Sequence, residues 1–304
     1  MSRYPVFIPS KGRWQPERAL TARCLSAAGV PFKLVVEPQE ADDYAAQHGE
    51  ENVTVLPFGE LGQGSIPARN WIKERATAEG HARHWQLDDN MRNFFRCYQG
   101  KRVRCPPDYA LSVVENFTDR YENVGVSGPT YSFFGFAKQP PFRVNAHVYS
   151  CSLVNNAAPH LWRGRYNEDA DLCLQLLAAG WCTLLVNAVQ VNKATTMTVA
   201  GGNTDDLYQG DGRLKMAEAL AERWPGVATV RHRYGRPTHH VNWGKFGPKL
   251  RLRDGLTLDP QPPDERVRLA AVGEVESPRL RRLLDEKPAE KSSPNRTPEG
   301  KINL

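Results

Sequence analysis

Short apolar runs alternate with segments of helical spacing along the first ninety residues. Runs at 5–9, at 32–36, at 53–58 and directly before Asp88 have the length and composition of buried strands. Between them we expect helices over 16–28 and 67–79. Pro16 suits a first helical turn, Gly29 suits a helix end, and Ser65 suits the cap of the second helix. This alternation predicts an α/β fold with a mainly parallel sheet covered by helices.

The pattern changes in the second half of the chain. Residues 124–154 are rich in strand-forming and aromatic residues and predict a β-rich insertion, whereas 167–180 and 213–224 have helical spacing. Between Pro260 and Pro298 there are seven prolines mixed with charges. We therefore expect a folded domain over 1–254 and a weakly ordered tail over 255–304, with one short helix near 278–286.

Charge and cysteine usage narrow the class of protein. The chain has 304 residues and a net charge of +6, and between Arg223 and Arg253 it carries eight Lys/Arg without one Asp or Glu. Such a stretch is either a surface for a phosphate-rich partner or an ordinary solvated face. The six cysteines lack metal-site spacing, and the sequence shows neither an apolar N-terminal signal nor a long apolar run. We expect a cytoplasmic protein with reduced thiols.

Two clusters of acidic residues, about eighty residues apart, lie at positions where their carboxylates could bind a cation or act on a substrate. Asp88 and Asp89 follow the fourth predicted strand, and Glu168, Asp169 and Asp171 open the helix that closes at Gly180. Ligands of parallel sheets bind beyond the carboxyl ends of the strands. Two carboxylates there can hold a divalent cation, and a third can act as a base. The pattern favours metal-assisted group transfer.

Four motifs follow one another in order: residues 8–13 (Ile-Pro-Ser-Lys-Gly-Arg), 68–70 (Ala-Arg-Asn), 87–90 (Leu-Asp-Asp-Asn) and 168–172 (Glu-Asp-Ala-Asp-Leu). Over residues 1 to about 200 this series resembles the GT-A class of nucleotide-sugar glycosyltransferases. More narrowly, residues 86–90, 149–152 (Tyr-Ser-Cys-Ser) and 201–203 (Gly-Gly-Asn) look like the TET/JBP-associated glycosyltransferases of bacteriophages. That resemblance implies a GT-A fold with the β-rich insertion on the acceptor side, and transfer of sugar to 5-hydroxymethylcytosine in phage DNA.

The resemblance also implies roles on the donor side. The nucleotide sugar would contact Ser10, Lys11, Gly12, Arg13, Arg69, Asn70 and Asp88. Mn²⁺ or Mg²⁺ would be held by Asp89, with Asp88 as second ligand and His240, of the pair His239–His240, completing the shell. The family pattern often has an acid where this chain has Asn90. From the residues alone, plainer interpretations stay open. Residues 88–90 could form an ordinary polar turn, Arg69 could be an exposed helical residue, and His239–His240 could be a surface pair.

For catalysis the resemblance makes Asp169 the base, with Glu168 or Asp171 orienting a substrate. An acidic helix N-terminus, favoured by the helix dipole, is the plainer reading. His147 and Lys193 are further pocket candidates. A DNA base must leave the stack before it can be modified, and Tyr131, Phe134, Trp162 and Arg163 are the candidates to receive it. A hydrophobic core would use the same aromatic residues.

These observations predict a metal-dependent hexosyltransferase that moves a sugar from a UDP-sugar to hydroxymethylated pyrimidines in DNA. Three alternatives remain open: a related enzyme acting on a saccharide or protein, a DNA-binding protein with a degenerate transferase domain, and an acid-cluster metallonuclease.

Overall fold

The computed structural model describes residues 2–98, 101–135, 139–194, 212–233 and 235–256. The strands are β1 (Val6–Pro9), β2 (Lys33–Val36), β3 (Val53–Val55), β4 (Arg83–Leu87), β5 (Met91–Tyr98), β6 (Lys101–Cys105), β7 (Val124–Tyr131), β8 (Phe142–Val144), β9 (Cys151–Asn155), β10 (Cys182–Lys193), β11 (Ala228–Arg233) and β12 (Arg236–Val241). The helices are α1 (Leu20–Ser26), α2 (Ala41–His48), α3 (Ile66–Ala78), α4 (Pro107–Thr118), α5 (Glu168–Ala178) and α7 (Gly212–Arg223), with 3₁₀ turns η1 (Pro38–Glu40), η2 (Glu50–Asn52) and η3 (Trp243–Lys245).

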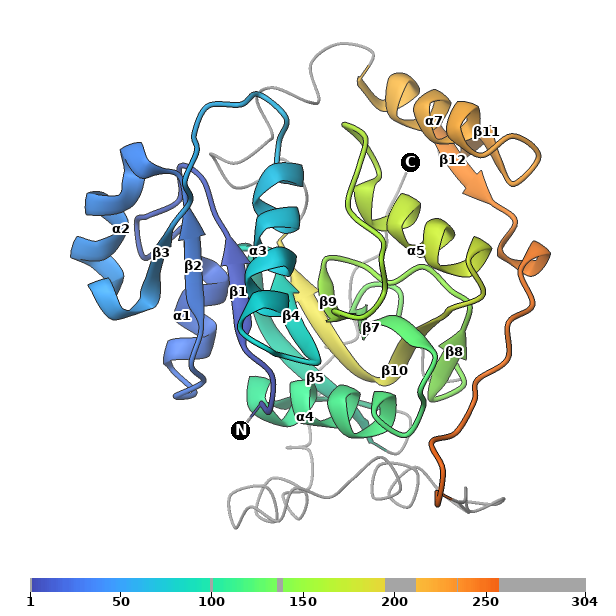
Figure 1. Ribbon diagram of the computed structural model, residues 1–304, viewed down its shortest axis with the longest axis horizontal. Coiled ribbons are helices and arrows are strands. Elements are labelled where there is room, and N and C mark those ends of the chain that lie inside the picture. The colour runs from blue at the N-terminus through green and yellow to red at the C-terminus, as the bar shows by residue number, and fades with distance from the viewer. Residues whose placement is uncertain (1, 99–100, 136–138, 195–211, 234, 257–304) are drawn as a thin grey trace, which may run out of the picture.

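A ten-stranded sheet forms the centre of the molecule, in the order β3-β2-β1-β4-β9-β7-β10-β5-β6, with β8 paired to β10 (Figure 1). The β3-β2-β1-β4 half is parallel, as is the β7–β10 pair. The pairs β4–β9, β7–β9, β5–β10 and β5–β6 are antiparallel. This helix-covered, Rossmann-like α/β architecture confirms the predicted fold class.

Alternation along the strands sends apolar side chains to both faces of the sheet. On one face, Val6 and Ile8 of β1 pack in a core with Leu25 of α1 and Leu111 of α4. On the other, Phe7 packs against α3, and Val126 and Val154 pack against α5. Because α3 and α5 cover the same face, their N-terminal turns are brought to one region of the sheet edge.

Several predicted elements differ from the observed ones. The first helix begins only at Leu20, and β3 ends at Val55 rather than at residue 58. Ser65 precedes α3, but its side chain makes no capping hydrogen bond. Strands β7 and β9 lie inside the central sheet between β4 and β10, not in a separate insertion. They are held there by pairing between distant segments, which local patterns do not reveal.

A small C-terminal unit completes the described structure. Strands β11 and β12 form an antiparallel hairpin, and α7 packs on it beside α5 (Figure 1). The 201–203 motif and the tail beyond residue 256 lie outside the described residues, so the predicted boundary at 254 stays a prediction. Within the described ranges, none of the helices has the length and apolar character that crossing a membrane requires.

Candidate active site

The sheet brings one end of several strands together around Asp88. β4 ends at Leu87, and β9 begins beside it because the two strands are antiparallel, with Leu87 paired to Cys151. Ser150 therefore stands next to Asp88, whose backbone N–H donates to the Ser150 carbonyl at 3.0 Å. Lys193 ends β10 and pairs with Met91, just after Asp88 and Asp89. This edge is where the sequence places its first acidic cluster.

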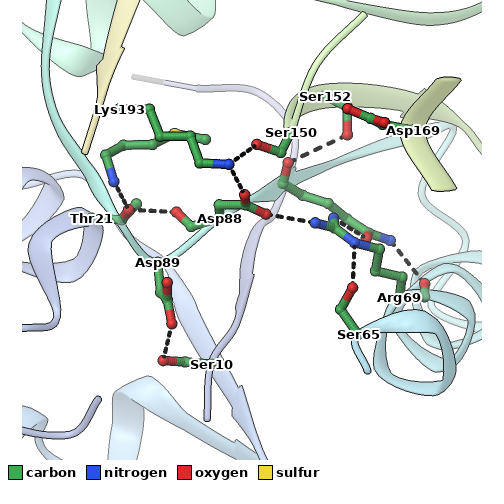
Figure 2. Close-up of polar contacts among 12 residues, drawn as sticks. Ser10, Thr21, Ser65, Arg69, Asp88, Asp89, Ser150, Ser152, Asp169 and Lys193 are labelled. Atoms are coloured by element: carbon green, nitrogen blue, oxygen red, sulfur yellow. Dashed lines mark hydrogen bonds and ion pairs between the residues drawn. The ribbon is translucent and has the colours of Figure 1, made fainter. Parts of the chain in front are cut away.

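Asp88 lies between two cations (Figure 2). Arg69 Nη2 is 2.6 Å from Oδ1, and Lys193 Nζ is 2.6 Å from Oδ2 and 3.2 Å from Ser150 Oγ. Burial alone would raise the pKa of Asp88, but Lys193 and Arg69 hold it well below its ordinary value. Burial would also lower the pKa of Lys193, which Asp88 raises instead. Asp88 and its two partners therefore carry two positive charges and one negative charge.

Asp89 points into the protein rather than toward Asp88's partners. It is 6% exposed, accepts a hydrogen bond from Ser10 Oγ at 2.8 Å and forms an ion pair with Arg13. Ser10 Oγ is also 2.7 Å from the hydroxyl of Tyr44. Burial raises the pKa of Asp89, in spite of the arginine beside it. Asp89 thus ties the loop after β1 to the end of β4.

The remaining donor-side candidates of the first loop bind the segment after β2. Lys11 Nζ pairs with Glu37 at 2.8 Å, and the Gly12 N–H donates to the carboxylate of Glu40. Asn70 makes two hydrogen bonds of 2.9 Å with the backbone of Trp162. Of the predicted donor residues, Arg69 and Asp88 are the pair that the structure brings together at the sheet edge.

The described residues do not form a metal site as they stand. Both oxygens of Asp88 face cations, and those of Asp89 face Arg13 and Ser10. Across the described ranges no group of three His, Cys, Asp or Glu side chains is placed to hold a metal ion. His240 lies among the arginines of the β11–β12 hairpin, where partial burial, Arg231 and Arg233 lower its pKa.

His239, the residue before His240 in β12, points to the opposite side of the hairpin from His240, because side chains alternate along a strand. It lies close enough to His147 and Asp169 for both to act on its pKa. Burial and the charge of His147 lower the pKa of His239, whereas Asp169 raises it. The electrostatic partners of His239 are therefore Asp169, of the second acidic cluster, and His147, whose Nε2 lies 3.2 Å from Asp169 Oδ2.

That cluster forms the first turn of α5. Asp169 Oδ1 accepts a hydrogen bond from the Ala170 N–H at 2.7 Å, and Oδ2 is 3.2 Å from His147 Nε2. Burial would raise the pKa of Asp169, but His147 and the Ala170 N–H lower it to about 2. Burial and Asp169 raise the pKa of Glu168. The charges of Glu168 and Asp169 also act on Arg69, so the two acidic clusters share one site.

Asp171, two residues later, belongs to the protein interior. Its fully buried carboxylate accepts hydrogen bonds from Arg163 Nε at 2.9 Å, Gln175 Nε2 at 2.8 Å and Trp224 Nε1 at 2.7 Å. It therefore joins α5 to the loop before it and to the end of α7. Arg163 is engaged in this network, and Trp162 is 3% exposed in the core under α5. Trp162 is therefore closed to an acceptor, whereas the Arg163 side chain is about half exposed although it is paired with Asp171.

The match to a family model decides the class of protein. The model of the TET-Associated Glycosyltransferase family matches residues 4–202, which contain both acidic clusters, Arg69, His147 and Lys193. The chain belongs to this family. A search of curated proteins found no match. The protein is accordingly a nucleotide-sugar-dependent glycosyltransferase.

In this TET-associated glycosyltransferase, a row of aromatic rings leads from the surface to Asp169. Phe133 and Phe134 are 57% and 43% exposed, and their ring centroids are 4.3 Å apart. Phe134 stacks on Tyr149 at 5.5 Å, and Tyr149 stacks on Tyr131 at 4.5 Å. Tyr149 also contacts His147 at 4.5 Å. Of the predicted acceptor residues, Tyr131 and Phe134 belong to this row.

The sequence names His147 and Lys193 only as pocket candidates and does not single out Trp243, although all three belong to the site of this TET-associated glycosyltransferase. Lys193 ends the apolar run of β10, and a cation at the end of a buried strand is a signal that could have indicated its role. His147 and Trp243 are brought together by stacking at 5.7 Å, although almost a hundred residues separate them. No local pattern reveals such a contact, because it depends on how the C-terminal hairpin packs on α5.

Proposed function

We propose that this glycosyltransferase moves a sugar from a UDP-sugar to the hydroxymethyl group of 5-hydroxymethylcytosine in DNA. The setting would be the modification of bacteriophage DNA in the host cytoplasm. The observation that carries the proposal is the aromatic row from Phe133 and Phe134 to His147 and Asp169. Exposed phenylalanine rings beside a charged site suit a planar acceptor such as a nucleobase. A base removed from the duplex stacks on such rings, which strengthens its binding by about 1–3 kcal/mol for each stacked base.

The cations around Asp88 suit the donor. Arg69 and Lys193 share the carboxylate of Asp88, with the acids of the α5 turn also acting on them, and both cations could turn from these partners to face a diphosphate. Charge-assisted hydrogen bonds to phosphate oxygens are strong, and a preorganised cation stabilises the charge that develops on a leaving group. The nucleoside diphosphate would therefore lie beside Asp88, between Arg69 and Lys193.

The β11–β12 hairpin suits the DNA backbone. Arg231, Arg233 and Arg236 are exposed on it, and no acidic side chain of the described residues pairs with them. The chain continues from this hairpin to Trp243, which stacks on His147. Phosphate contacts at the hairpin would thus be made close to the acceptor side of the site, with the salt dependence that such contacts produce.

The reaction would be a single displacement with inversion. The acceptor oxygen attacks the anomeric carbon, the bond from that carbon to the diphosphate oxygen breaks, and the diphosphate leaves with the electron pair. The acceptor proton is removed at the α5 turn, where Asp169 and His147 meet.

The test is release of nucleoside diphosphate from a panel of UDP- and GDP-sugars. Each donor is offered with duplex or single-stranded DNA that contains cytosine or 5-hydroxymethylcytosine, in Mn²⁺, in Mg²⁺ and in chelator. We expect release from a UDP-sugar that requires the hydroxymethyl group. The chelator arm tests the metal requirement that the family resemblance implies.

Three outcomes would contradict parts of the proposal. Release that does not depend on DNA moves the acceptor to a saccharide or protein. Release with a GDP-sugar alone changes the donor, and DNA binding without any release supports a degenerate transferase domain. Replacing Arg231 and Arg233 by Gln should weaken DNA binding and flatten its salt dependence. Replacing Arg23 of α1 and Lys33 of β2, which are exposed and lie outside the C-terminal unit, is the charge-matched control and should change both much less.

A further inference from the structure

The side chain of His147 is held by three separate parts of the chain. Its ring lies 4.5 Å from that of Tyr149 and stacks on Trp243 with an interplanar angle of 19°. On its third side, Nε2 is 3.2 Å from Asp169 Oδ2 at the start of α5. The ring is about one-fifth exposed, so it is positioned by the protein and still open to a small group. This combination of fixed orientation and partial access is typical of a group that exchanges a proton with a substrate.

The two nitrogens of the ring have different surroundings. Nε2 is buried against Asp169, at an ion-pair distance of 3.2 Å, although the two groups are not aligned for a hydrogen bond. Catalytic hydrogen bonds are often loose before substrate binds. No described residue forms a hydrogen bond with Nδ1. Asp169 therefore favours a proton on Nε2, which leaves the lone pair of Nδ1 for another donor.

Asp169 is better suited to orient this ring than to take a proton itself. One oxygen accepts the Ala170 N–H, the other faces His147, and together these contacts hold the pKa of Asp169 at about 2, against the effect of burial. A carboxylate of such low basicity is a weak base near neutral pH. Placed against an imidazole, it stabilises the imidazolium that forms when the ring accepts a proton.

The charged and titratable groups around His147 are few. Asp169 faces it from α5, His239 from β12 and Tyr149 from the segment before β9. Glu168 and Lys193 act on it through Asp169. Asp169 is the one acidic group in direct contact among the described residues, so a positive charge on the ring has one dedicated partner.

We propose that His147 is the general base of the transfer and that Asp169 is its positioning residue. Nδ1 of His147 accepts the proton of the acceptor hydroxyl while the hydroxyl oxygen forms its bond to the anomeric carbon. The bond between that carbon and the diphosphate oxygen breaks, and the electron pair leaves with the diphosphate. The proton stays on the imidazolium, paired with Asp169, and is then lost to water. This inference deepens the proposed function by naming the base of the same site.

The first test compares His147→Ala, His147→Gln and Asp169→Asn, with His81→Gln as matched control because His81 is a surface histidine paired with Glu79. We expect His147→Ala to lower kcat about 100- to 10,000-fold with KM for either substrate changed by less than about 3-fold. Added imidazole should restore part of the turnover of His147→Ala but none of that of Asp169→Asn. The acidic limb of the kcat/KM profile should disappear in His147→Gln. A double variant that combines His147→Ala with Asp169→Asn should be no slower than His147→Ala alone, because the two residues act as a unit.

A second measurement needs no turnover. In a nuclear magnetic resonance spectrum of the ¹⁵N-labelled protein, the neutral His147 ring should carry its proton on Nε2, and Asp169→Asn should disturb that preference. A proton on Nδ1 would overturn the proposal, since that nitrogen could then accept none. The proposal would also be overturned if His147→Gln kept half of the wild-type kcat while Asp169→Asn was inactive, because Asp169 itself would then be the base. If the wild type proves active on an acceptor other than 5-hydroxymethylcytosine, the proposed function fails, and the same variants test His147 on that acceptor.

Discussion

Asp171 offers the sharpest test of which acidic residues in the 168–172 motif act in catalysis and which stabilise the fold. The sequence makes it a catalytic candidate, whereas the structure buries it completely beneath Arg163, Gln175 and Trp224. Removing one partner of a buried charged pair costs about 3–5 kcal/mol. The Arg163 side chain is 51% exposed and can be rehydrated by water, which places the expected loss at the lower end. We expect Asp171→Ala to lower the free energy of unfolding by about 3 kcal/mol and Asp171→Asn by about 2 kcal/mol.

Urea denaturation followed by tryptophan fluorescence measures this loss, and Trp224 reports on the site directly. With an m-value of about 3 kcal/mol/M, the midpoint of Asp171→Ala should fall by about 1 M. Below the transition, turnover of the folded protein should stay within about threefold of the wild type. Asp169→Asn is the matched control, with greatly reduced turnover and a smaller fall of the midpoint, because the Asp169 side chain is about one-third exposed and Asn can still accept the Ala170 N–H. If Asp171→Asn instead keeps the wild-type midpoint and loses turnover, the carboxylate acts in catalysis and the structural role argued for it is wrong.

Three further outcomes follow from the structure. Burial lowers the pKa of His84 from 6.5 to about 3, and its neutral ring hydrogen-bonds to Asn156 and Gln86. Below pH 6.5 the unfolded chain binds a proton that the folded chain does not, so the free energy of unfolding should fall by about 1.4 kcal/mol per pH unit toward pH 3. Urea midpoints across this range should fall more steeply for the wild type than for His84→Gln. Lys193→Met should lower kcat by roughly 100-fold or more in the diphosphate-release assay, with Lys193→Arg less affected, because a preorganised charge at the leaving group is lost. Phe134→Ala should weaken binding of a single-stranded acceptor by roughly 10-fold in fluorescence anisotropy, with donor KM unchanged, because one stacking surface is removed.

Much of the parallel half of the fold could be predicted because its elements are encoded locally. β1 and β4 are short apolar runs between polar turns, and α3 and α5 carry apolar residues at helical spacing. The helix α2 was not predicted because it buries a single large side chain, Tyr44, and otherwise has no apolar face. The positions of β7 and β9 depend on pairing across the sheet, as do those of β5 and β6. The helix α4 was missed for a different reason, since its residues carry a local apolar pattern that could have predicted it.

The candidate site could be located from the sequence, but the roles within it could not be divided. Adjacent carboxylates such as Asp88 and Asp89 look alike in sequence, yet one faces Lys193 and the other faces Arg13. Asp169 and Asp171 differ in the same way, because side chains two residues apart on a helix point in different directions. The choice of side-chain direction is made by packing.

The family match ends at residue 202, but residues beyond it help to bury α5. Leu174 of α5 packs against Leu220, Ala228 and Val241, and Trp243 closes over His147. A fragment ending at 202 would leave one side of α5 bare to water, so the unit that folds is longer than the region that the family model matches. In this chain α7 and the β11–β12 hairpin supply the missing cover, and a truncation at the end of the matched region should therefore destabilise the turn of α5 that carries Asp169.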